Sequence, residues 1–227
     1  MKEKSIKDSA KAKEFVEKIF KVIEEAKLPQ DLENIMEMFH PNNIMSESKY
    51  PKITFSIDKK ELEELSDFSL KGDNIESLKN NIQNNTLAKL LYALVWKNGD
   101  LVKLKHIIKG IKNVDQVEDD KNDGLVFYQF GKYLTNQNNE PIVDQHVLRA
   151  FAISDRMRKS DRINSSISEW QKMETINKSN KFLIKDYKEW LKVLPINNGT
   201  AENYTNEIDK ILFALGKTIK HKPNSNK

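Results

Sequence analysis

Apolar residues recur every three or four positions through most of this 227-residue chain, and this spacing is the strongest constraint on its fold. In residues 8–27, Phe15, Ile19 and Ile23 fall on one side of a helix, and Pro29 ends the pattern. Such periodicity is typical of amphipathic helices. Only 7 Gly and 6 Pro occur, too few for the many turns of an all-β fold. The sequence therefore predicts an all-α protein, a compact multi-helix bundle of about nine to eleven helices.

Polar and glycine residues at the ends of apolar segments predict where the other helices begin and end. Asp31 and Asp58 are expected to start helices, because Asp is a favoured N-cap. Residues 87–97 form the most apolar segment and are expected to be central, with Gly99 ending that helix in the left-handed conformation. Residues 41–58 are expected to be an extended connection. Helices are predicted over 32–39, 59–67, 75–84, 87–97, 101–111, 125–134, 145–158, 182–194 and 203–220, with a short one around Trp170.

The length fits one domain, which we expect to span residues 1–220. The N-terminal helices and the extended connection, residues 1–58, are expected to pack on the rest of that domain. The final residues, 221–227, are expected to be a disordered tail. We expect the protein to be a monomer.

Composition excludes several kinds of site. The chain has no cysteine, which rules out disulfides, thiolate zinc or iron–sulfur sites and cysteine nucleophiles. His40 and His106 have no second ligand at a suitable spacing, so neither a metal nor a cofactor is expected. No apolar run approaches the roughly 18 residues of a membrane span, and the N-terminus lacks an apolar signal core. A cytoplasmic protein with no membrane partner is expected. The net charge of +4 is compatible with nucleic acid.

The most informative stretch reads Pro141-Ile-Val-Asp144-Gln-His146-Val147-Leu-Arg149. It is preceded by Gly124 and the apolar segment Leu-Val-Phe-Tyr-Gln-Phe-Gly-Lys-Tyr-Leu. The pattern indicates a turn, a helix, an extended segment, and a second helix that opens on Asp144. An Asp before an apolar helical run is the usual N-cap arrangement, so a purely structural cap is one interpretation of Asp144.

These residues resemble the helix-hairpin-helix DNA glycosylase superfamily, the endonuclease III-like enzymes. Its signature is a Gly-containing hairpin, an apolar helix, and a Pro-Val-Asp segment whose Asp opens a helix written Asp-x-His-Val-x-Arg. The resemblance covers residues 124–149 and implies a divergent helix-hairpin-helix glycosylase core. The family's hairpin glycines are replaced here by the acidic run 117–123. Such charges repel DNA unless they point away from it or hold a cation.

The resemblance implies a catalytic role for Asp144. Its carboxylate would activate water and stabilise the sugar cation as the N-glycosidic bond breaks. Bifunctional members carry an amine nucleophile two residues after the last hairpin glycine, where this chain has Val126. A monofunctional enzyme is therefore implied, with Lys132 as the less favoured substitute nucleophile.

The resemblance also implies contacts with double-stranded DNA and with a flipped base. Backbone N–H groups at the start of the helix 125–134 would bind a phosphate. Arg149 would either brace the site or approach the DNA backbone. Residues expected to contact DNA are Gly124, Leu125, Lys97, Asn98 and Arg149. Residues expected at the base pocket are Trp96, Phe127, Tyr128 and His146.

Several of the residues assigned to the base pocket also suit a purely structural role. Phe127 and Tyr128 also suit a core, Trp96 suits a core cap, and His146 suits a structural hydrogen-bond partner. For the whole chain, the leading hypothesis is a monofunctional DNA glycosylase acting on a damaged or modified base, in repair or in defence against modified invading DNA. The alternatives are a non-catalytic helix-hairpin-helix DNA-binding protein, favoured by the acidic hairpin, and a helical protein-interaction module, favoured by the near balance of charges.

Overall fold

The computed structural model of the chain describes most of it in several stretches. These are residues 4–46, 48, 50, 53, 55–64, 86–99, 101–115, 124–137, 140–157, 166–197 and 204–221. The predicted helix 75–84, the acidic run 117–123 and the ends of the predicted helices 59–67 and 145–158 lie outside the described residues. So do the side chains of Trp96 and Lys97 and residues 222–227.

The described residues form helices joined by turns and extended segments, and no strand occurs among them. The all-α prediction is confirmed. The chain divides into two compact units, one made of Met1–Ile53 with Pro141–Lys227, the other of Thr54–Glu140. Each is described by itself below as unit 1 and unit 2. The expected single domain over 1–220 stays a prediction.

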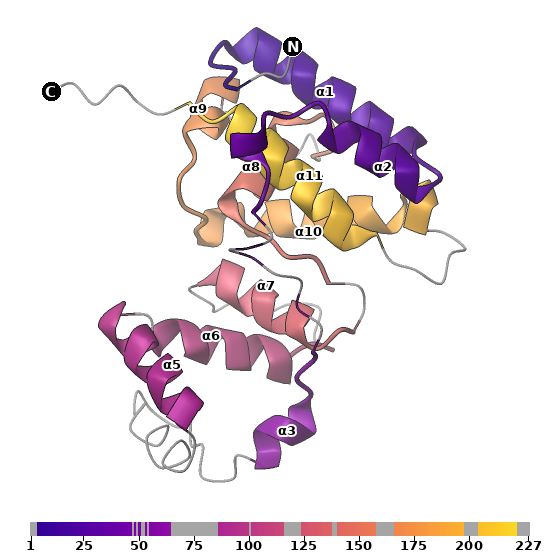
Figure 1. The fold of residues 1–227 in the computed structure, drawn as a ribbon. Helices are drawn as coiled ribbons and strands as arrows, with labels where there is room; N and C mark the ends of the chain where they lie inside the picture. Colours follow the sequence, from indigo (N-terminus) through magenta and orange to yellow (C-terminus); the bar gives the residue numbers. More distant parts are fainter. Residues whose placement is uncertain are drawn as a thin grey trace, which may run out of the picture. The chain divides into compact units, whose positions relative to one another are not determined.

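Unit 1 is built around two helices, α8 and α11, that pack side by side (Figure 1). Every residue from Val147 to Ile153 in α8 is buried, which places this helix inside the unit. The helices are α1 (Ser9–Glu25), α2 (Pro29–Met36), α8 (Gln145–Ile153), α9 (Ile167–Lys172), α10 (Lys181–Lys192) and α11 (Thr205–Thr218), with 3₁₀ turns at Pro41–Asn43, Lys178–Asn180 and Pro195–Asn197.

The close approach of α8 and α11 depends on a glycine. A Cβ built on Gly216 would lie only 1.9 Å from the carbonyl oxygen of His146. The absence of a side chain at this position lets the two backbones meet. Helix α11 continues past this glycine to Thr218, so Gly216 lies inside the helix and serves its packing against α8.

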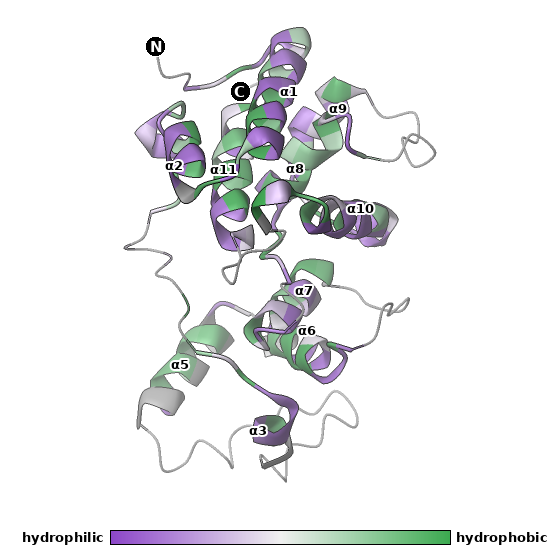
Figure 2. Ribbon diagram, turned by 90° about the vertical axis from the view of Figure 1, so that its right-hand side faces the viewer, coloured by the Kyte–Doolittle hydropathy of each residue, from purple (hydrophilic) through white to green (hydrophobic). Residues whose placement is uncertain are grey.

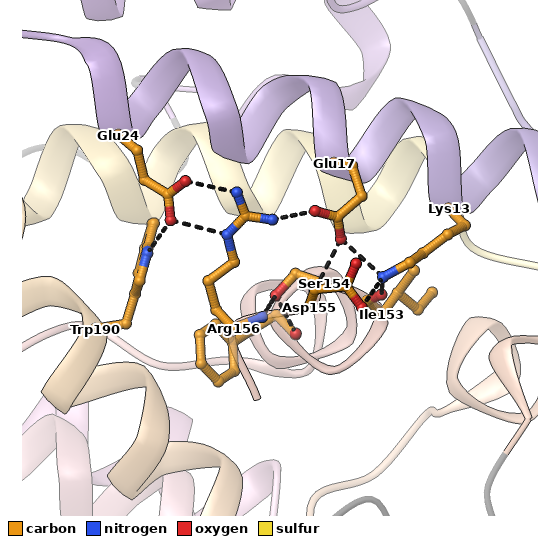
Figure 3. A network of polar contacts seen from close by, with 9 residues as sticks. Lys13, Glu17, Glu24, Ile153, Ser154, Asp155, Arg156 and Trp190 are labelled. Atoms are coloured by element: carbon orange, nitrogen blue, oxygen red, sulfur yellow. Dashed lines mark hydrogen bonds and ion pairs between the residues drawn. The ribbon is translucent and has the colours of Figure 1, made fainter. Parts of the chain in front are cut away.

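A network of charged side chains joins α1 to the turn after α8 (Figure 3). Arg156 lies between two carboxylates of α1, donating to Glu17 and, from Nε at 2.8 Å, to Glu24. The indole N–H of Trp190 on α10 donates to Glu24 at 2.9 Å. Lys13 donates to Glu17 and to the carbonyl of Ile153, each at 2.8 Å. The network ties α1 and α10 to the C-terminal end of α8.

The start of α2 corrects one prediction. Asp31 was expected to be the N-cap, but α2 begins at Pro29, whose fixed φ suits the first turn of a helix. Asp31 therefore lies inside the first turn and accepts from the backbone N–H groups of Lys27 and Leu28, both at 3.0 Å. The helix also ends earlier than predicted, at Met36.

Unit 2 contains α3 (Lys59–Glu64), α5 (Thr86–Lys97), α6 (Leu101–Lys112) and α7 (Leu125–Leu134). The predicted start of α3 is confirmed, because Asp58 accepts from Glu61 N at 2.9 Å and Glu61 accepts in return from Asp58 N at 2.7 Å. Residues 55–58 belong to no helix or strand, in keeping with the connection expected over 41–58, but the 3₁₀ turn at Pro41–Asn43 in unit 1 corrects the start of that prediction.

Two glycines bring α6 and α7 into contact. A Cβ on Gly110 would lie 2.0 Å from the Tyr128 carbonyl oxygen, and one on Gly131 would lie 2.0 Å from that of Ile107. Facing glycines allow helix backbones to approach more closely than larger side chains would permit. This pair is the most extensively packed part of unit 2.

Helix α5 differs from the prediction that it is central. It is mostly apolar (Figure 2), yet Leu90, Leu91 and Leu94 are 63%, 54% and 58% exposed. The expectation rested on hydrophobicity alone, which indicates a surface that favours burial but not the partner that buries it. Gly99 after this helix has φ +70°, so the predicted left-handed residue is confirmed.

Candidate functional site

Asp144 opens α8 as its N-cap, as the sequence predicts. Its backbone is extended, and Oδ1 accepts from the N–H groups of His146 at 2.7 Å and Val147 at 2.9 Å. Both cap hydrogen bonds use the same oxygen. Oδ2 accepts no hydrogen bond from any residue in the described part of the chain. One oxygen is thus fixed to a rigid helix start, while the other can meet water or a substrate.

The surroundings of Asp144 favour its protonated form relative to an ordinary aspartate. Burial raises the pKa of this carboxyl group, against the lowering effect of its two cap hydrogen bonds and of the positive charges on Arg149 and Lys217. A carboxylate with a raised pKa is a stronger base than a solvated one. It is therefore better suited to accept a proton from water near neutral pH.

A second buried carboxyl group, Asp209 on α11, lies close enough to Asp144 to be affected by its charge. Asp209 Oδ2 accepts from the backbone N–H of Ile142 at 2.7 Å, and Oδ1 accepts from the hydroxyl of Tyr187. Burial, reinforced by the charges of Asp144 and Glu207, raises the pKa of Asp209 to about 8. Sequence reasoning missed Asp209 and Tyr187. The available signal was an acid on the apolar face of a predicted helix.

His146 and Arg149 contact each other on α8, the helix that Asp144 opens. Arg149 is 0% exposed, and its Nη1 lies 2.7 Å from His146 Nδ1 and donates to the Gly216 carbonyl at 3.0 Å. Nη2 donates to the carbonyl of Met173. Because a guanidinium can only donate, Nδ1 of His146 accepts and the imidazole proton lies on Nε2. Burial, followed by the charge of Arg149, lowers the pKa of His146 to about 3.

This burial decides between the two roles expected of Arg149. A fully buried guanidinium has no surface to offer a phosphate, so the expected contact with the DNA backbone is wrong for this structure. Arg149 braces the site instead, by tying α8 to α11 and to the residue after α9. His146 is likewise held as a neutral hydrogen-bond acceptor, which is the structural interpretation of that residue.

A second aromatic side chain and a lysine stand next to this pair. The ring of Phe213 on α11 meets that of His146 edge to face, with centroids 4.9 Å apart. Lys217 Nζ lies 5.4 Å from the Phe213 centroid and donates to the Asn42 carbonyl at 2.9 Å. Both side chains are half-buried. Sequence reasoning missed Lys217 as a cation near Asp144.

Unit 2 holds the other predicted site residues. Gly124 is the N-cap of α7 with φ +73°, and a Cβ there would lie 2.5 Å from the His106 ring. Leu125 is buried behind it, and Asn98 is exposed. Among the described atoms, therefore, the first turn of α7 presents backbone rather than a large side chain at its cap.

The aromatic residues of α7 differ in accessibility. Tyr128 is buried, and Lys132 Nζ lies 5.4 Å from its ring centroid, with the lysine itself only 4% exposed. Phe127 is half-buried, with Lys103 Nζ 5.1 Å from its centroid. Tyr128 therefore fits the core interpretation better than Phe127. Whether these residues share a pocket with His146 of unit 1 stays a prediction.

Comparisons with protein-family models, with curated proteins and with solved structures found no match. In the described part of the chain, no helix is both long enough and apolar enough to cross a membrane. Within those same stretches, no three His, Cys, Asp or Glu side chains are grouped as a metal ion would require.

Proposed function

We propose that this chain is a monofunctional DNA glycosylase that hydrolyses the N-glycosidic bond of a flipped damaged or modified base in double-stranded DNA. The observation that carries the proposal is the geometry of Asp144. One carboxylate oxygen is anchored by two backbone N–H groups, and the other accepts no hydrogen bond from any described residue. A divergent helix-hairpin-helix glycosylase core, working as a monomer, forms part of the proposal.

The chemistry requires a fixed negative charge beside the sugar. As the bond to the base breaks, positive charge develops on the sugar ring, and a nearby carboxylate stabilises it. The same group accepts a proton from the water that attacks the sugar. Asp144 suits both tasks, because its position is set by the helix start and burial raises its pKa.

Two residues of α7 support a water-using reaction. Val126 stands where the resembling family's bifunctional members have a lysine nucleophile. Lys132, the substitute considered above, is only 4% exposed and lies against Tyr128. A buried amine of this kind is poorly placed to attack a sugar. The proposal therefore assigns no Schiff-base intermediate to this enzyme.

DNA would bind through backbone and exposed polar groups rather than through Arg149. The left-handed Gly124 opens α7 without a side chain, so the N–H groups of its first turn would receive a phosphate. Exposed Asn98 is a further proposed contact, and half-buried Phe127 is proposed to stack on the flipped base.

The test is release of free base from duplexes that each carry one damaged or modified base, together with genomic and phage DNA rich in modified bases. The proposal predicts free base and an intact abasic strand from at least one duplex. It also predicts that borohydride traps no covalent adduct between protein and DNA. If no duplex loses its base, the proposal fails. A trapped adduct would contradict the monofunctional assignment and direct attention to Lys132.

A second candidate function, a helical protein-interaction module, is favoured by one observation. Leu90, Leu91 and Leu94 of α5 are each more than half exposed on an apolar helix. Exposed apolar patches often mark contacts with another protein. Under this function, replacing the three leucines with serine would abolish binding of the protein partner. Asp144→Asn would leave that binding unchanged.

A further inference from the structure

The segment that carries Asp144 is held from outside its own helix. Residues 141–143 belong to no helix or strand, and they lead directly into Asp144 and α8. The backbone N–H of Ile142, two residues before Asp144, donates to Asp209 Oδ2 at 2.7 Å. The Asp209 side chain of α11 therefore accepts a hydrogen bond from the backbone of the segment that leads into Asp144.

Asp209 is itself fixed by a second element. Its other oxygen accepts the hydroxyl of Tyr187 on α10, and Asp209 and Tyr187 are 5% and 0% exposed. A buried carboxyl group with hydrogen bonds to both oxygens has little freedom to move. The arrangement runs from Tyr187 through Asp209 to Ile142, and joins α10, α11 and the entry to α8.

We propose that Asp209, held by Tyr187, is a positioning residue for Asp144: it fixes the Pro141–Val143 segment so that the free oxygen of Asp144 keeps one orientation. The inference rests on the proposed function for its catalytic meaning. Its structural content is independent of that function, because the hydrogen bond to Ile142 can be observed without any substrate. Asp209 touches no reacting atom in this scheme.

The charged groups around Asp209 allow its interaction with Asp144 to be measured through the pKa of Asp209. The titratable groups that face it are Asp144, Tyr187 on α10 and Glu207 on its own helix. Burial raises the pKa of Asp209 to about 8 and raises that of Tyr187 well above its ordinary value. Because Asp144 contributes to the first of these shifts, replacing its charge must lower the pKa of Asp209. This shift reports that the two carboxyl groups lie close together, and the exchange measurement below reports whether Asp209 positions Asp144.

Three variants test separately the charge of Asp209, its acceptor oxygen and the hydroxyl of Tyr187. Asp209→Asn keeps an oxygen that can accept from Ile142 but no longer titrates, Asp209→Ala removes the acceptor, and Tyr187→Phe removes only the hydroxyl. Thr218→Val is the matched control. It disrupts buried hydrogen bonds on the same helix, to Ala214 and Asn43, which lie away from Asp144 in the hydrogen-bond network.

The first measurement is an NMR titration of the full chain without DNA. The amide of Ile142 should show an inflection near pH 8 in the wild type and in Thr218→Val. The inflection should disappear in Asp209→Asn and move to lower pH in Asp144→Asn. An Ile142 amide that titrates identically in all four proteins would overturn the proposal, whether or not the protein releases any base.

The second measurement is hydrogen exchange at the amides of Ile142, His146 and Val147. Asp209→Ala should accelerate exchange at all three, because the segment and the cap loosen together. Asp209→Asn should restore protection, and Tyr187→Phe should give an intermediate result. If Asp209→Ala accelerates only Ile142 and leaves the cap amides of Asp144 unchanged, the positioning role is wrong.

The third measurement, base release, tests whether the hydrogen bonds from Tyr187 and Ile142 to Asp209 matter for catalysis. Small misplacement of a catalytic group typically costs up to about 100-fold in rate, so Asp209→Ala should lower single-turnover release by roughly 10- to 100-fold. Asp209→Asn should stay within about 3-fold of the wild type below pH 7. Equal rates for Asp209→Ala and the wild type would contradict the positioning role. Absence of release by the wild type would instead contradict the proposed function. The NMR titration would still test whether Asp209 interacts with Ile142 and Asp144.

Discussion

Gly216 lies directly against the main chain of His146, so that a Cβ at this glycine would be 1.9 Å from the His146 carbonyl oxygen. The same glycine offers its own carbonyl to Arg149 Nη1 at 3.0 Å. One residue of α11 therefore fixes both the spacing of the two central helices of unit 1 and the guanidinium of Arg149.

Gly216→Ala should destabilise unit 1 although alanine favours helices. The new methyl group meets backbone atoms, which cannot rotate away, and overpacking of this kind costs about 1–3 kcal/mol. Urea unfolding followed by circular dichroism measures the change. Gly99→Asn is the control, since no atom lies within 4 Å of a Cβ there and Asn tolerates its φ of +70°. Equal stability of both variants would contradict the close packing of α8 and α11.

Arg149→Lys should be destabilising even though the charge is kept. Lysine cannot reproduce the planar fork that reaches His146, Gly216 and Met173 together. Leaving buried acceptors unsatisfied costs about 1–3 kcal/mol. Lys192→Met, a change at an exposed lysine of the same unit, should alter the free energy of unfolding by less than about 0.5 kcal/mol. A wild-type stability for Arg149→Lys would show that the guanidinium fork is not needed.

His146 should make the fold sensitive to acid. Its pKa is about 3 in the folded protein against an ordinary value of 6.5, so the unfolded chain binds the extra proton between these values. This contribution to stability is present above pH 6.5 and is lost as the pH falls towards 3, with a slope of at most about 1.4 kcal/mol per pH unit.

The measurement is urea unfolding between pH 4 and 7 for the wild type, His146→Gln and His40→Gln. Only His146→Gln should change the slope of this dependence, making it less positive by up to about 1.4 kcal/mol per pH unit. Asp209 acts in the opposite direction, because its raised pKa favours the folded state at low pH and disfavours it as pH rises towards 8. The difference in slope between His146→Gln and the wild type isolates the contribution of His146 to the pH dependence of stability. An unchanged slope in His146→Gln would contradict its burial as a neutral group.

Arg156→Met should weaken the attachment of α1 to the end of α8. Arg156 joins Glu17 and Glu24, and its hydrogen bond lowers the pKa of Glu24. Hydrogen bonds to charged groups contribute about 1.5–3 kcal/mol each, reduced here by partial exposure to solvent. We expect a loss of about 1–3 kcal/mol in the free energy of unfolding.

The control for this change is Lys21→Met on the same helix. Lys21 pairs with Glu25 at 3.9 Å, with both side chains mostly exposed. Exposed pairs at this spacing contribute about 0.5 kcal/mol or less. If Arg156→Met costs no more than Lys21→Met, the network of Figure 3 does not contribute to holding the helices together.

Local sequence signals predicted the parts of the fold that depend on neighbouring residues. The helix start at Asp58, the left-handed Gly99 and the N-cap Asp144 are each determined within a few positions. The start of α2 was misplaced for the same local reason, because Pro29 and Asp31 are both favourable in a first turn and only the structure shows which one begins it.

Long-range partners explain what the sequence could not predict. Asp209 and Ile142 are 67 positions apart, and nothing near either residue indicates that they meet. Arg149 was ambiguous between bracing and DNA contact because its burial depends on α11 and on the residue after α9. The exposed leucines of α5 show the same limit, since hydrophobicity predicts the surface to be buried but not the partner.

The most direct test of the account is single-turnover base release by Asp144→Asn on the best duplex found with the wild type. Asparagine is as good an N-cap as aspartate, so the hydrogen bonds to His146 and Val147 are kept while the charge and the basic oxygen are lost. We predict unchanged stability and DNA affinity, and a rate lower by about 10²- to 10⁴-fold. Release at the wild-type rate by Asp144→Asn would contradict the central role of this carboxylate.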